Sequence, residues 1–572
     1  MYDRLQKVGV SLSHNGMLQQ MTGISGSFNS ELIDSVRRGK KFRIVGDNVN
    51  FNIGVAQARK SLGKSGHMEH WFGSAAIIQN VDFTGLSDIA PQQDLRHVPH
   101  TTFLLSNTEF AQEVSHMSHL AAQILVEHFP WLKFAKAAMN EVHYPPPGVD
   151  IKNKVIPLPI LHKNEQKYAD VIDILDSYQE LCDSTFESAE VPSQKVHIGG
   201  DQLTRERFSG ARRLRAAAFT DTERLEGLDP ITFELFHLQM TVLNTFFQIL
   251  YDSQNTESFT LHSQKVRLLR KDADGNDVKN HYDSCKDLAE SVIKAYVVEA
   301  ACEHIGLPDT ETVPENIPDY SHMTSEEIQS WLVDQVEPII NNVTKSTRHA
   351  LNGTYIHEEN PDYIYSYGNI VIELGLIYME LCDIVKNPNR DRLLQIMKYL
   401  MIVLKGHNNR SKYALEILRL LCYQYALLSE KSANETIYGL FVNTGKTIIP
   451  ADLQMEYLVR LTKGHLRSMC SNVTEQSLVK RSSSFFGMNE ISEHFDKETG
   501  TIKRAQKHKR LSSFDDERKI ISNLRAVRPF LETPGRKVQS MKKSPKNPIT
   551  KLALEDFIKW IEFHKVNLFY EL

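Results

Sequence analysis

Short apolar runs bounded by glycine or polar residues alternate with helix-like segments in the first third of the chain. The runs at 41–54, 67–83 and 195–201 have the length and composition of partly buried strands. Apolar residues at helical spacing cover 105–143 and 165–187. The pattern predicts a sheet assembled from the early runs, with helices around it.

Downstream the pattern changes twice. From Pro230 to about Leu428 it is almost entirely helical, with loops near 269–280 and 308–324. From about Arg481 it becomes polar and basic, and residues 501–550 hold 14 Lys and Arg against 4 Asp and Glu. Such a composition is typical of disorder. A short amphipathic helix is expected to close the chain.

Bulk composition excludes several classes of protein. The net charge of −5 over 572 residues gives no bulk attraction for polyanions. The six cysteines are scattered without a Cys-x-x-Cys pair, which argues against a zinc finger and a disulfide scaffold. No apolar run is long enough for a membrane span, and no targeting segment is recognisable at the start. We expect a nuclear or cytoplasmic protein that is not secreted, with the basic run 503–510 as an import signal or DNA tether.

Candidate chemistry centres on two Gly-Asp pairs at the ends of predicted strands, Gly46-Asp47 and Gly200-Asp201. Two carboxylates on adjacent strands can hold Mg²⁺ or Mn²⁺, which prefer oxygen ligands and support phosphodiester chemistry. The simpler interpretation is that Gly-Asp ends each strand in a turn.

A third acidic residue, Glu416, lies among apolar residues in a predicted helix. A carboxylate in that setting is costly unless it is paired or metal-bound. Arg419 or Lys412 could pair with it along the helix, which is the structural alternative. Asp452 and Glu456, four residues apart, could supply the third carboxylate instead.

Basic residues follow Asp201 closely, and a lone histidine lies further on. We predict nucleic-acid contacts for Arg205, Arg207, Arg212, Arg213 and His237, with Arg215 in the same run. A solvated helix face is the alternative for the arginines, and a core position is the alternative for His237.

Several blocks in order resemble a known family. They are Gly46–Asn50, His70–Ala75, Gly200–Thr204, Phe236–Met240, Asn409–Glu416, Ile449–Leu458 and Ser471–Glu475. The chain resembles the domain of unknown function 6589 family, found in fungal and invertebrate proteins that look derived from mobile elements. That family is similar to DDE-type transposases with an RNase H-like core.

The resemblance implies an α/β fold: an RNase H-like mixed sheet interrupted by a large all-helical insertion, with a disordered basic C-terminal tail. Asp47, Asp201 and Glu416 would be the catalytic, metal-binding triad. The implied boundaries are 1–40 for an N-terminal helical segment, 41–204 for the first part of the core, 205–405 for the insertion, 406–480 for the rest of the core, 481–550 for the basic linker and 551–572 for the last helix.

The expected function is that of a transposon-derived protein with a metal-dependent, nuclease-like core acting on DNA. The alternative is an inactive, domesticated DNA-binding or helical scaffold protein, so whether the chain is an enzyme stays open at this point. DNA is the expected partner, no membrane is, and a homo-oligomer is left open. Transposases usually carry a separate DNA-reading domain, often zinc-bearing, and the cysteine pattern does not provide an ordinary one.

Overall fold

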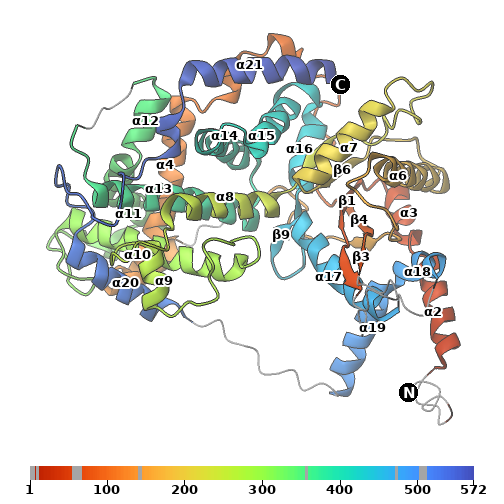
Figure 1. Ribbon diagram of the computed structural model, residues 1–572, viewed down its shortest axis with the longest axis horizontal. Helices are drawn as coiled ribbons and strands as arrows, with labels where there is room; N and C mark the ends of the chain where they lie inside the picture. The colour runs from red at the N-terminus through yellow and green to blue at the C-terminus, as the bar shows by residue number, and fades with distance from the viewer. Residues whose placement is uncertain are drawn as a thin grey trace, which may run out of the picture. The chain divides into compact units, whose positions relative to one another are not determined.

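The computed structural model describes residues 7, 12–53, 67–139, 145–354, 359–469, 474–500 and 512–571. The chain divides into two compact units (Figure 1). The sheet unit comprises residues 1–88, 146–237 and 430–508, and the helical unit comprises 89–145, 238–429 and 509–572. The basic run 503–510 lies outside the described residues.

A five-stranded mixed sheet organises the first unit, in the order β5-β4-β1-β6-β7. The strands β1, β4 and β5 are antiparallel neighbours, whereas β6 and β7 run parallel to the central β1. The strands are β1 (Phe42–Asn48), β4 (Phe72–Ile78), β5 (Val155–Pro157), β6 (His197–Gly200) and β7 (Ile231–Phe233).

Helices cover both faces of this sheet because its central strands are apolar on both sides. Ile44 of β1 packs in one core with residues of α3 (Ser30–Arg37), α6 (Tyr168–Ala189) and α7 (Gln202–Leu214). Val45, the next residue, packs in the opposite core with residues of α17 (Ala451–Met469). The sheet unit is therefore a three-layer arrangement, with α17 on the face opposite α6 and α7.

Smaller elements complete the sheet unit. Its two short hairpins pair β2 with β3 and β8 with β9. The bounds are α2 (His14–Gly26), β2 (Phe51–Ile53), β3 (His67–Glu69), α16 (Glu430–Gly439), β8 (Phe441–Asn443), β9 (Ile448–Pro450), α18 (Glu475–Ser482) and α19 (Ser484–Thr499).

The second unit is built from helices around α10 (Tyr282–Ile305), whose middle is buried on nearly every side. Within the described residues, no helix is both long and apolar enough to cross a bilayer. The other helices are α4 (Asn107–His128), α5 (Lys136–Met139), α9 (Leu261–Arg267), α11 (Ser325–Val343), α12 (Lys345–Leu351), α13 (Tyr363–Lys386), α14 (Arg390–His407), α15 (Lys412–Cys422), α20 (Phe514–Val527) and α21 (Leu554–Glu571). Helix α8 (Leu235–Leu250) begins in the sheet unit and continues into this one.

The prediction of a disordered C-terminal tail over 481–550 was wrong for its described part. Helix α19 occupies 484–499, and α20 packs on α10. Ile520 and Leu524 of α20 are fully buried. Several arginines of this stretch pair with acids elsewhere in the chain: Arg525, for example, pairs with Glu299 at 3.0 Å. Composition alone gave the wrong prediction, because it does not show that arginines of this stretch pair with acids distant in sequence.

The expected combination of a mixed sheet with a large helical portion is confirmed, and the protein as a whole is mostly helical. The final helix is also confirmed, as α21.

Candidate active site

Two aspartates meet at the carboxyl ends of adjacent parallel strands. In the β1–β6 pairing, Val45 lies opposite Gly199, and the same register carried two residues further sets Asp47 opposite Asp201. Neighbouring strands are about 4.8 Å apart. The charge of Asp201 accordingly acts on the Asp47 carboxyl.

Two glycines allow this approach. A Cβ on Gly200 would collide with the Thr204 side chain and the Gly46 carbonyl oxygen. A Cβ on Gly199 would occupy the place of the Arg43–Glu234 ion pair, which is fully buried. The glycines preceding Asp201 are therefore required by packing around the strand end, in addition to any turn preference.

Local hydrogen bonds orient both aspartates. Asp201 is the N-cap of α7 and accepts from the Thr204 amide at 2.7 Å. Asp47 accepts from the Asn48 amide, also at 2.7 Å. A buried acid that sequence reasoning missed, Glu165, accepts from the side chains of Asn48 and Thr204 and so connects the two strand ends.

Helix α17 brings two more acids to the same place, in distinct roles. Asp452 is buried and accepts from the backbone amides of Phe236 and His237, each at 3.0 Å, at the start of α8. It also binds His237 Nδ1 at 2.9 Å. Glu456, one turn further, lies 3.7 Å from His237 Nε2, and 38% of its side chain is exposed. Asp452 therefore positions the histidine, while Glu456 leaves the cluster accessible to solvent.

Burial and the charges of neighbouring groups shift the pKa values of this cluster. Burial and the charge of Glu456 raise the pKa of Asp47 well above its usual value, Asp201 adds to this, and His237 opposes it. Burial lowers the pKa of His237, but the hydrogen bond to Asp452 and the charges of Asp452, Asp47 and Asp201 outweigh it and raise that pKa to about 9. Burial raises the pKa of Glu165, with the charge of Asp201 acting in the same direction.

Of the predicted triad, the structure brings Asp47 and Asp201 together, with Glu456 as the neighbouring acid. Glu416 belongs to the helical unit, on α15, and is buried in an ion pair with Arg419 at 3.5 Å. The acids that the sequence left open as an alternative, Asp452 and Glu456, are the ones beside His237.

The arginines after Asp201 lie on α7 with different surroundings. Arg205 is buried, and Arg207 stacks on the Tyr168 ring at 4.9 Å. Arg212 pairs with Asp229 at 3.0 Å, and Arg213, near the end of α7, is exposed. Arg215, just past α7, pairs with Asp176 at 2.7 Å. Much of the charge of this run is therefore used within the protein.

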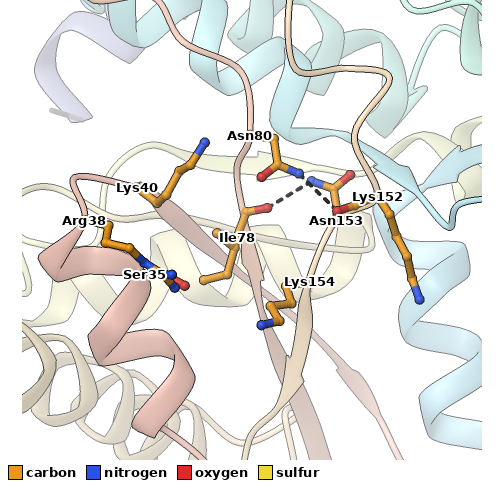
Figure 2. Close-up of a pocket in the computed structure, with 8 residues that line it drawn as sticks. All are labelled: Ser35, Arg38, Lys40, Ile78, Asn80, Lys152, Asn153 and Lys154. Atoms are coloured by element: carbon orange, nitrogen blue, oxygen red, sulfur yellow. Dashed lines mark hydrogen bonds between the residues drawn. The ribbon is translucent and has the colours of Figure 1, made fainter.

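A basic pocket of about 460 Å³ is lined by residues just before β1, at the end of β4 and at the start of β5 (Figure 2). Asp47 lies near the other end of β1. Asn153 Nδ2 donates to the Ile78 carbonyl at 2.9 Å, which ties the start of β5 to the end of β4. Exposed cations surround this junction: Arg38, Lys40, Lys152 and Lys154. The pocket is a second cationic surface of the sheet unit, formed by residues far apart in sequence.

Among the described residues, one set of three His, Cys, Asp or Glu side chains has ligand atoms that all lie within 4.8 Å of one another. This set lies in the helical unit and consists of Glu113, His116 and Glu380. The acids of the sheet cluster form no such set among the described residues, so their ligand atoms are spread more widely. An open set of carboxylates suits Mg²⁺, which keeps several of its waters and takes only one or two carboxylates from the protein.

The sequence model of the family of unknown function DUF6589 matches residues 93–508, which is more than half of the chain, and the chain belongs to that family. The match includes Asp201, His237, Asp452 and Glu456, and begins after Asp47. Comparisons with curated proteins and with solved structures gave no match.

Proposed function

We propose that the sheet unit carries a divalent-metal-dependent site for cleaving or transferring phosphodiester bonds in DNA. Asp47, Asp201 and Glu456 would be the metal-binding carboxylates. The observation that carries the proposal is the convergence of Asp47 and Asp201 at adjacent strand ends beside an accessible third acid. Acids held together at a strand edge against their mutual repulsion are more typical of functional sites than of stability.

The strand order supports an RNase H-like core, because that fold also has a three-stranded antiparallel meander followed by two strands parallel to the first. Its acids lie on the first and fourth strands and on a later helix that packs on the sheet. Asp47, Asp201 and Glu456 have those positions here, on β1, just after β6 and on α17. This analogy at the level of the fold also underlies the proposed similarity to transposases.

The side chains present fit Mg²⁺ or Mn²⁺. All three are carboxylates, the ligand type that hard divalent cations prefer. The pKa of Asp47 is raised first by burial and then by the charges of Glu456 and Asp201, and a bound cation would relieve that repulsion. Such an ion, when bound, activates a water or hydroxyl nucleophile and stabilises the leaving oxygen of a phosphodiester.

His237 has a role of its own in this proposal. Its Nδ1–H donates to Asp452, so Nε2 lies toward Glu456 and the open side of the cluster. With a pKa of about 9, the ring is protonated at neutral pH. A protonated Nε2–H can donate a hydrogen bond to a phosphate oxygen as negative charge develops there.

Contacts with the DNA backbone would come from cations of the sheet unit. Arg213 is exposed near the end of the helix that Asp201 caps. The basic pocket of Figure 2 adds Arg38, Lys40 and Lys152, which are exposed, whereas its fourth cation, Lys154, pairs with Glu31. Lysine and arginine side chains of this kind bind phosphates without reading the sequence.

A second candidate function is a protein that binds DNA or another partner without cleaving it. It is favoured by one observation: protonated His237 already offsets part of the carboxylate charge. The cluster could then be stable without a metal ion.

The experiment is cleavage of supercoiled plasmid and of oligonucleotide duplexes over a Mg²⁺ and Mn²⁺ titration, with wild type beside Asp201→Asn. Asparagine is as good an N-cap as aspartate, so the variant keeps α7 and loses only the charge. The matched control is Asp176→Asn, which removes an acid of α6 that pairs with Arg215. Metal-dependent cleavage that disappears in Asp201→Asn and persists in the control supports the proposal. Absence of cleavage in wild type, with DNA binding retained, supports the second candidate.

A further inference from the structure

A second cluster of ionisable side chains lies in the helical unit, with no part in the proposed cleavage. Glu113 and His116 lie three residues apart on α4, and Glu380 faces them from α13. Residues three apart share one face of a helix. His116 Nδ1 lies 3.9 Å from Glu113 Oε1 and 3.5 Å from Glu380 Oε1.

Glu113 has an unusual position in this cluster. Its side chain has no exposed surface, and neither carboxylate oxygen accepts a hydrogen bond. His116 Nδ1 and Glu380 Oε2 are likewise buried without a hydrogen bond. Buried polar atoms nearly always have partners, so four unsatisfied atoms around one point form a candidate binding site for an ion.

The charged groups around these atoms indicate which kind of ion would suit the cluster. Arg392 of α14 binds Glu380 Oε1 through Nε at 3.1 Å and Nη2 at 2.9 Å, and it also pairs with Asp383. The guanidinium therefore holds Glu380 in place and leaves Oε2 available. The cationic group nearest to Glu113 in these contacts is the His116 imidazole, at 3.9 Å and without a hydrogen bond, so a cation between the three side chains would satisfy the Glu113 carboxylate.

We propose that Glu113, His116 and Glu380 bind a divalent transition metal ion that links α4 to α13. One imidazole nitrogen with two carboxylates is a ligand set for Zn²⁺ or a similar ion, rather than for Mg²⁺. Helical bundles build metal sites in this way, from a Glu-x-x-His pair on one helix and a glutamate on a facing helix.

Access and geometry agree with this assignment. The His116 side chain is 30% exposed, whereas both glutamates are fully buried, so an ion can enter past the imidazole. The three ligand atoms lie within 4.8 Å of one another, and small rotations would bring them to coordination distance. Because two helices are joined, the expected role is structural.

The test measures Co²⁺ and Zn²⁺ binding to the full chain carrying Asp201→Asn, so that the sheet site is impaired. Visible absorption of Co²⁺ reports nitrogen and oxygen coordination, and elemental analysis after dialysis gives the Zn²⁺ stoichiometry. Glu113→Gln and His116→Gln are added singly. His119→Gln, one turn further along α4 and bonded to Gln123 and Gln329, is the control.

We expect one tightly bound ion in the parent and the control, and a loss of at least tenfold in affinity in both ligand variants. The metal-free Glu113→Gln protein should melt at a higher temperature than its parent, because a buried unpaired charge is removed. Unchanged metal content in both ligand variants would overturn the proposal. The proposal would also be overturned if the parent bound no metal and metal-free Glu113→Gln melted at a lower temperature than the parent. The cluster would then be an ion pair between the glutamates and protonated His116. Neither result depends on DNA cleavage.

Discussion

Each unit gathers acids around one histidine, and the two clusters differ in what holds them. In the sheet unit, backbone amides and Asp452 hold the aspartates and His237 at strand ends and helix starts. In the helical unit, Glu113 lies 3.9 Å from His116 Nδ1 and accepts no hydrogen bond. Glu456 is 38% exposed, whereas Glu113 is fully enclosed.

The differences in hydrogen bonding and exposure indicate what each cluster can do. A set fixed by backbone hydrogen bonds and open to solvent can admit a large substrate and keep its geometry through a reaction. An enclosed set with unsatisfied ligand atoms suits an ion that remains bound and stabilises the fold. We therefore expect function to depend on the first cluster and stability on the second.

The largest expected effect separates the two clusters directly. Asp47→Asn should lower metal-dependent cleavage at least about 100-fold, because metal ligands supply several kcal/mol of transition-state stabilisation. Glu113→Gln should leave cleavage within about threefold of wild type under conditions where both proteins are folded. Initial rates on one oligonucleotide duplex at saturating Mg²⁺ provide the comparison. Equal losses of cleavage rate in the two variants would show that the clusters do not differ in function.

Asp47→Asn should also raise the melting temperature of the metal-free protein. Burial and Glu456 raise the pKa of Asp47, so its ionised form destabilises the folded state at neutral pH. Asparagine removes that charge in nearly the same volume. A variant that is more stable and less active is the expected signature of a residue kept for function.

The next effect concerns His237 and pH. Its pKa is raised from about 6.5 to about 9 in the folded state, so the protonated ring stabilises the fold fully below pH 6.5, and this contribution is lost as pH rises through 9. The contribution is on the order of 3 kcal/mol. Burial also raises the pKa of Glu234 to about 8, so ionisation of this carboxyl likewise lowers the stability of the fold as pH rises toward 8.

The difference between wild type and His237→Gln therefore isolates the histidine. Urea unfolding at pH 6 and pH 9.5 should show a wild-type advantage at pH 6 that shrinks at pH 9.5. A pH-independent difference between the two proteins would mean that His237 is neutral in the folded state.

The sequence predicted a good part of the sheet cluster, for physical reasons that are local. A Gly-Asp pair after an apolar run places a carboxylate at a strand end, and the parallel pairing of β1 with β6 then brings Asp47 to Asp201. The sequence also singled out His237, as a nucleic-acid contact, but did not indicate its partner Asp452, which lies 215 residues away.

Other parts could not be read locally. Glu416 and Glu456 both lie on partly apolar helices, and periodicity does not say which helix packs on the sheet. Glu165 lies in a polar loop with no pattern that distinguishes it. The Glu113–His116 spacing is visible in the sequence. It indicates a binding site only together with Glu380, which lies on a helix more than 260 residues later.

The smallest expected effect tests the basic pocket of the sheet unit. Lys40→Glu combined with Lys152→Glu should weaken DNA binding several-fold and reduce the slope of log affinity against log salt by about 2. Lys559→Glu, at an exposed lysine of α21, should change neither quantity. Fluorescence anisotropy at four salt concentrations is sufficient, and an unchanged slope in the double variant would remove the pocket from the DNA-binding surface.

The most direct test of the central claim compares Glu456→Gln with Glu416→Gln in the Mg²⁺-dependent cleavage assay. If Asp47, Asp201 and Glu456 form the site, Glu456→Gln abolishes cleavage while Glu416→Gln retains it, with an effect on stability because the Arg419 ion pair is broken. Cleavage that survives Glu456→Gln and disappears in a folded Glu416→Gln protein would contradict the account.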